Sequence, residues 1–175
     1  MNCCYIEILV SLVSFGVALY FLFVKPRART PFFAAWAVGM LCSVILEIVN
    51  ERLFAGQGTV YTDVLLPFRP FQFPVAIVLL TGLYAASLGC ISHRVSLLVA
   101  PRHIVVRFAI VVGATAILNL ASLGIEHAGI AVGWWRHQRA ADLSRIYGPI
   151  YLFYSAAALP AALVFTAVER WRRTS

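Results

Sequence analysis

Charged side chains are scarce in this sequence. Only 12% of its 175 residues are Asp, Glu, Lys or Arg, whereas 62% are hydrophobic. A soluble domain carries about a quarter charged residues, and the mean hydropathy here is +0.88. The shortage of charge excludes an ordinary soluble domain and predicts a single all-α domain, residues 1–175, embedded in a membrane.

Metal-binding and nucleotide-binding motifs are also lacking. The four histidines are scattered along the chain, and no cysteine pair has ligand spacing beside a histidine. There is no Asp-rich motif that would hold Mg²⁺ on a diphosphate, and Gly56-Gln57-Gly58 is too short for a nucleotide-binding fingerprint. We therefore expect no metal and no cofactor.

A nucleic-acid partner is not expected, although the net charge is +7. The basic residues form short clusters between apolar runs, as membrane topology signals do, and not one patch studded with aromatics. The partners that this composition favours are membrane lipids and a hydrophobic small molecule. The oligomeric state is left open.

Five apolar runs are long enough to cross a bilayer, which takes about 20 residues each. The N-terminus lacks a basic region and a cleavage site, so its run is expected to be a retained helix. If the N-terminus lies outside the membrane, most lysine and arginine residues fall in the segments on the inner side, as the positive-inside rule favours. The sequence therefore predicts an outer N-terminus and an inner C-terminus. The runs span roughly 5–24, 32–50, 73–91, 104–126 and 147–168.

Three acidic residues lie inside these runs, where a carboxylate is costly unless it has a function. Glu47 and Glu126 lie near the ends of the second and fourth runs, and Glu7 lies near the start of the first. In a five-span topology these positions fall at one depth, near the outer surface. Glu47 and Glu126 are the strongest candidates for catalytic residues.

Polar residues recur at helical spacing around each candidate acid. Thr115, Asn119, Ser122 and Glu126 share one helix face, and a second face includes Glu47 and Asn50. Such faces are expected to turn toward the interior of the bundle. Hydrogen bonding between helices is the alternative role for the smaller residues. Asn119, Asn50 and Glu7 are kept as candidate substrate contacts.

Two similar units follow the first run, which suggests one helix plus two parallel two-helix repeats. Each unit has an acid near the end of its first helix, an aromatic loop, and a proline at the start of its second helix. The first unit contains Glu47, Tyr61 and Phe73-Pro74-Val75. The second contains Glu126, Trp134-Trp135 and Tyr147-Gly148-Pro149-Ile150.

These same residues resemble a known family, from Glu47 to about Tyr154. The chain is similar to the integral membrane proteins of carotenoid biosynthesis that include bisanhydrobacterioruberin hydratase. In outline it also resembles small membrane-bound terpene cyclases, which use two separated carboxylic acids and no metal. It departs from the family at Glu126-His127, where Asp-Pro is usual. The resemblance implies an isoprenoid substrate and acid chemistry.

The residues themselves support protonation of an alkene or epoxide. Two carboxyls in one apolar site cannot both ionise comfortably, so one keeps a proton to donate. We expect Glu126 to be the acid and Glu47 its partner or base, with reversed roles left open. Aromatic faces would stabilise the carbocation, and the candidates are Trp134, Trp135, Tyr61, Tyr147 and Tyr151.

Other interpretations remain open from the sequence alone. The tryptophans are equally typical of the aromatic belt at a membrane surface. The main function hypothesis is an isoprenoid cyclase or hydratase. A sterol-type double-bond isomerase resembling the emopamil-binding protein group is one alternative. A small transporter or lipid-binding subunit without enzyme activity is the other.

Overall fold

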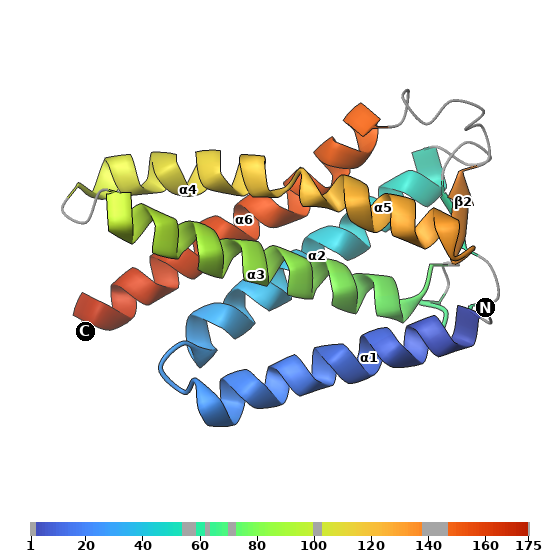
Figure 1. Cartoon of the computed structure of the whole chain (residues 1–175), viewed down its shortest axis with the longest axis horizontal. Helices are drawn as coiled ribbons and strands as arrows, with labels where there is room; N and C mark the ends of the chain where they lie inside the picture. The colour runs from blue at the N-terminus through green and yellow to red at the C-terminus, as the bar shows by residue number, and fades with distance from the viewer. Residues whose placement is uncertain are drawn as a thin grey trace.

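Five membrane-length helical segments form one bundle, as the computed structural model shows (Figure 1). The predicted all-α class is confirmed. The structure describes residues 3–53, 59–61, 64–69, 73–99, 103–137 and 147–174. Within these ranges the helices are α1 Cys3–Leu19, which continues into the π-helical turn η1 Tyr20–Val24, then α2 Arg29–Leu53, α3 Val75–Val99, α4 Ile104–Leu118, α5 Ala121–Ala131 and α6 Tyr147–Thr174.

The third helix is longer than the apolar run predicted. α3 continues to Val99 instead of ending near Ile91, so His93 and Arg94 lie inside the helix and not in a loop. No glycine or proline interrupts residues 92–99, and apolar residues resume after Arg94. A single charged position does not end a helix whose local propensity remains favourable.

The fourth span is one run that contains a break between α4 and α5. The Asn119 amide donates to the Thr115 carbonyl at 2.8 Å, in the ordinary α-helical pattern. The Leu120 amide then donates to the Ile117 carbonyl at 3.1 Å, three residues back, which tightens the turn. The chain continues as α5, so Glu126 lies within a helix and not at its last residue.

Small residues allow α2, α3 and α6 to pack closely. A Cβ added at Gly82 of α3 would lie 2.6 Å from Trp36 Cδ1 of α2. A Cβ added at Gly89 would lie 3.0 Å from the Ala162 Cα of α6. Close approach at small residues is a main source of helix association in lipid, where the hydrophobic effect between helices is absent.

The helices after α1 pack around the pair formed by α3 and α6. α2 packs on both α3 and α6, and α4 also packs on both α3 and α6, which are themselves in contact. The two loops are joined by strands β1 Thr59–Tyr61 and β2 Trp135–His137, which pair antiparallel with Val60 opposite Arg136. The predicted repeat of two parallel two-helix units stays a prediction.

The first helix is peripheral to this core. α1 lies at the edge of the bundle (Figure 1), packs mainly on α3 and leaves most of its apolar side chains exposed. Tyr5, Leu9, Leu12 and Phe15 are each at least 60% exposed. In a membrane these side chains face lipid.

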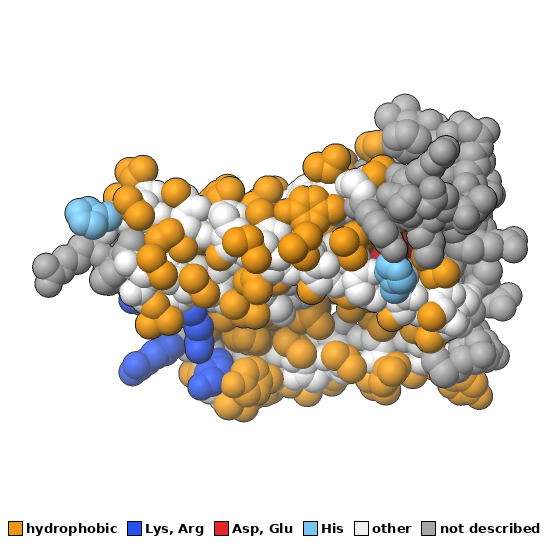
Figure 2. Space-filling model, turned by 45° about the horizontal axis from the view of Figure 1, so that its top comes forward, with side chains coloured by type: hydrophobic (Ala, Val, Ile, Leu, Met, Phe, Trp, Pro, Cys, Tyr) orange, Lys and Arg blue, Asp and Glu red, His pale blue; other side chains and the backbone are white. Residues whose placement is uncertain are grey.

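The two ends of the bundle differ in composition. The end that carries the start of α1 together with β1 and β2 is called the loop end (Figure 1). The opposite end, called the basic end, carries the turn at Lys25, the start of α4 and the C-terminal part of α6 (Figure 1). Figure 2 shows a largely hydrophobic face on which Lys and Arg gather at the basic end.

Candidate functional site

Glu47 lies buried near the loop end of α2, with only 4% of its surface exposed. The phenol of Tyr61 in β1 donates a hydrogen bond to Glu47 Oε1 at 2.7 Å. Asn50, one turn further along α2, also interacts with this carboxyl through its side chain. The helix face predicted to turn inward therefore does so, and it presents Glu47 to the loop that follows it.

Glu126 reaches the same region from α5. Its side chain is 6% exposed, and its charge interacts with that of Glu47. Both glutamates also interact electrostatically with Tyr154 of α6. The structure thus brings together the two predicted acids, although they are far apart in the sequence. We call Glu47, Glu126, Tyr61 and Tyr154 the acid cluster.

Tyr61 is held over the cluster by the pairing of β1 with β2, in which it lies opposite Trp135. Burial raises the pKa of Tyr61 well above its ordinary value of 10, and the nearby charge of Glu47 raises it further. The charge of Glu126 acts in the same direction more weakly. Tyr61 therefore stays protonated near neutral pH and acts as a donor toward Glu47.

Tyr154 was not among the residues singled out as a site. It is 5% exposed, and its ring meets the edge of Tyr84 with 5.9 Å between centroids. The available sequence signal was its spacing of two turns from Tyr147, which places both on one helix face. The structure adds the two glutamates on the facing helices, which no local pattern could reveal.

Glu7 lies at the same end but has a different environment. Its carboxylate is 2% exposed and accepts the backbone N–H groups of Leu65 at 2.9 Å and Leu66 at 3.2 Å. Both oxygens are thereby engaged by the segment 64–69. Glu7 fastens this segment onto α1, and this contact accounts for its burial.

Asn119 and Tyr151 connect helices at the α4–α5 break. The Asn119 amide nitrogen donates to Ser155 Oγ at 2.8 Å and to the Tyr151 carbonyl at 3.2 Å. Its side-chain oxygen accepts from the Tyr84 phenol at 3.1 Å. The Tyr151 phenol donates to the Ala116 carbonyl at 2.8 Å. These contacts give both residues the interhelical role that was the alternative for the polar faces.

Trp134 is buried in a cluster of apolar side chains that includes Ile6 of α1, Ile77 of α3 and Phe73, which precedes α3. With 3% exposure it is not a belt residue facing the membrane surface, so that alternative is wrong for Trp134. Gly133 before it has φ +74°, a conformation that glycine adopts without strain. The side chains of Trp135 and Tyr147 lie outside the described part of the structure.

Comparison with known proteins gives no relative. No family model matches the chain, and no curated protein or solved structure matches it either. Among the residues that the structure describes, no group of three His, Cys, Asp or Glu side chains is placed to hold a metal ion. The geometry of the acid cluster is therefore the basis for any statement about function.

Proposed function

We propose that this protein is a membrane-embedded isoprenoid cyclase or hydratase that protonates an alkene or epoxide with a carboxylic acid. The observation that carries the proposal is the acid cluster. Two buried carboxyls and two buried or half-buried phenols converge from α2, β1, α5 and α6 at one end of an apolar bundle. The resemblance of the Glu126–Ile150 stretch to carotenoid-biosynthesis membrane proteins supports the same chemistry.

The hydrogen bond from Tyr61 favours one assignment of roles. A phenol that donates to Glu47 stabilises Glu47 as the carboxylate. Repulsion between neighbouring carboxylates also favours a pair that shares one proton. Glu126 is accordingly the general acid and Glu47 the general base.

The reaction balances with these groups alone. The Glu126 O–H bond breaks as the alkene π electrons form a C–H bond, which leaves a carbocation on the neighbouring carbon. A second alkene of the substrate attacks this carbon in cyclisation, or water attacks it in hydration. Glu47 then takes the released proton, and transfer back to Glu126 restores the starting state. The aromatic rings of Tyr154 and Tyr61 are the groups of the acid cluster that would stabilise the cation.

The test replaces each acid by its neutral isostere. Glu126→Gln and Glu47→Gln are assayed in membranes supplied with linear polyprenyl substrates, with products separated by chromatography and identified by mass and by NMR. Because general acid–base groups contribute about 10²–10⁴-fold, each variant is expected to lose at least about 100-fold in turnover. Glu169→Gln, which changes an acid of α6 at the basic end, is the matched control and should retain activity.

Several outcomes distinguish the proposal from its alternatives. Full activity in both acid variants overturns it. A product with the mass of the substrate and a shifted double bond, without a ring, identifies an isomerase. Proton or solute flux in proteoliposomes that depends on Glu47 and Glu126, with no chemical product, identifies a transporter.

A further inference from the structure

A group of polar side chains at the basic end is buried without hydrogen-bond partners. His93 of α3 is 3% exposed, and neither ring nitrogen has a partner among the described residues. Thr166 of α6 is fully buried, and its hydroxyl has none either. The Nε atom of Arg107 of α4 is also buried and has no hydrogen-bond partner among the described residues. An unsatisfied buried polar group costs about 1–3 kcal/mol, so three together require an explanation.

These three residues come from α3, α4 and α6, three helices that all pack on one another. The His93 ring lies 5.6 Å from the ring of Phe165, the residue before Thr166. Among the charges that act on His93, that of Arg107 is the strongest. Thr166 lies about three turns after Ser155, which places it on the α6 face that bonds to Asn119 at the end of α4. We call His93, Arg107 and Thr166 the basic-end junction.

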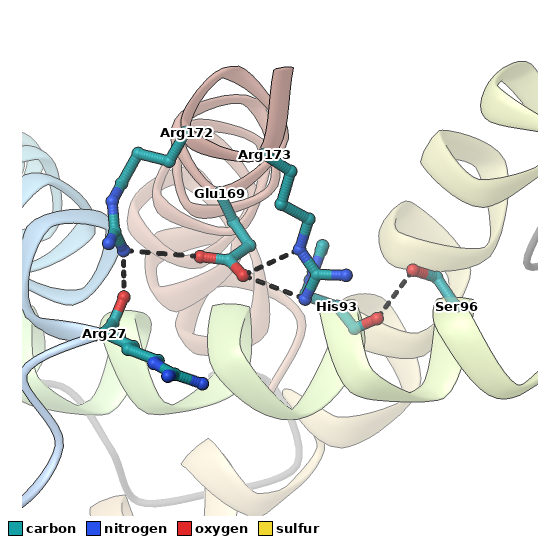
Figure 3. A network of polar contacts seen from close by, with 6 residues as sticks. All are labelled: Arg27, His93, Ser96, Glu169, Arg172 and Arg173. Carbon is teal, nitrogen blue, oxygen red and sulfur yellow. Dashed lines mark hydrogen bonds and ion pairs between the residues drawn. The ribbon is translucent and has the colours of Figure 1, made fainter. Parts of the chain in front are cut away.

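The surroundings of the junction are positive. Arg94 and Arg173 also interact with His93, and Glu169 is the acid that does so. Glu169 is already paired with Arg173 at 2.9 Å and with Arg172 at 3.8 Å (Figure 3). Arg94 and Arg107 form no ion pair within the described part of the chain. The three unsatisfied groups can all donate hydrogen bonds, so the complementary ligand carries negative charge and several acceptor oxygens.

We propose that the basic-end junction binds a phosphate group, with His93, Arg107 and Thr166 donating to its oxygens. The junction lies near the helix ends, within about two turns of the start of α4 and about two turns of the end of α3. This is the depth at which phospholipid headgroups meet a membrane helix, and basic sites between helices bind anionic lipid headgroups. The proposal is independent of the acid cluster at the opposite end.

The experiment measures phosphate binding by the full chain, purified in a phosphate-free maltoside detergent. One arm adds a short-chain phosphatidylglycerol, and the other adds inorganic phosphate. Native mass spectrometry counts bound molecules, and the shift of the thermal unfolding midpoint gives affinity. We expect one phosphatidylglycerol per chain. Binding of the lipid alone identifies a headgroup as the source, and binding of inorganic phosphate as well identifies a free phosphate group as sufficient.

Two variants test the residues. Arg107→Gln removes a charged donor, which is worth about 1.5–3 kcal/mol, so the affinity is expected to fall roughly 10-fold to 100-fold. Thr166→Val is nearly isosteric and keeps the helix, and it is expected to weaken binding by about 3-fold to 10-fold for one neutral hydrogen bond. Arg172→Gln, which changes a paired arginine at the same end, is the control and should bind within two-fold of the wild type.

The proposal is overturned by either of two results. One is that neither phosphatidylglycerol nor inorganic phosphate binds the wild-type chain. The other is that Arg107→Gln and Thr166→Val bind as tightly as Arg172→Gln. If Arg107→Gln fails to fold, Thr166→Val decides alone, because its shape and apolar burial are conserved.

Discussion

The two ends of this bundle differ in whether their buried polar groups have hydrogen-bond partners within the protein. At the loop end, buried acids are met by donors of the protein itself, with Tyr61 on Glu47 and two backbone amides on Glu7. At the basic end, the donors of His93, Arg107 and Thr166 are buried and have no acceptor among the residues that the structure describes. Under the proposal for the basic-end junction, a bound phosphate supplies the acceptors that these donors lack.

The largest expected effect concerns coupling within the acid cluster. If Glu126 and Glu47 act on one proton, the double variant Glu47→Gln/Glu126→Gln should lose no more activity than the worse single variant, roughly 100-fold or more. Multiplied losses would show that the two acids act independently. The measurement is turnover on polyprenyl substrate for the wild type, both single variants and the double variant.

A smaller effect, on stability, is expected from removing the hydrogen bonds between Glu7 and segment 64–69. Glu7→Ala removes the acceptor of the Leu65 and Leu66 amides, and the free energy of unfolding should fall by about 1–3 kcal/mol. Unfolding in mixed detergent micelles measures this change, and amide hydrogen exchange at residues 65 and 66 locates it. Glu7→Gln keeps one acceptor oxygen and should lose less. Equal exchange in all three proteins would show that the contact does not hold the segment.

The smallest effect is a pH dependence that belongs to Tyr61. Because the folded pKa of Tyr61 is raised above 10, folding favours its protonated form. That contribution to stability is fully present below pH 10 and is lost as the pH rises from 10 toward the folded pKa. The free energy of unfolding should therefore fall less steeply above pH 10 in Tyr61→Phe than in the wild type. Identical slopes would mean that Tyr61 titrates as it does in the unfolded chain.

The sequence predicted much of this arrangement because membrane helices obey simple rules. Apolar length located five spans, and helical periodicity identified the inward faces that bury Ser122, Glu126 and Glu47. Because successive spans cross the membrane in opposite directions, the second and fourth spans run the same way, which predicted Glu47 and Glu126 at the same end. These inferences need only local pattern and topology, and the structure agrees with them.

Other features depend on contacts between residues far apart in the chain. The hydrogen bonds from the Leu65 and Leu66 amides to Glu7 join residues whose positions in the sequence follow no helical spacing. The hydrogen bonds of the Asn119 side chain to two other helices, α3 and α6, give its amide a structural role. Trp134 was predicted either to stabilise a carbocation or to belong to the aromatic belt at the membrane surface, but it is buried in a cluster with side chains of α1 and α3. None of these outcomes is encoded in a window of neighbouring residues.

The unequal lengths of the spans have a consequence for how protons reach the acid cluster. At about 1.5 Å per residue, Tyr5–Val24 measures about 30 Å, which matches the hydrocarbon thickness of a bilayer, whereas Ile104–Ala131 measures about 42 Å. The long span must tilt or extend beyond the lipid tails. Glu126 lies about 13 Å from the midpoint of that span, close to the edge of the hydrocarbon layer. Under the proposed function, an acid at this depth can exchange protons with the adjacent water without a proton pathway through the membrane.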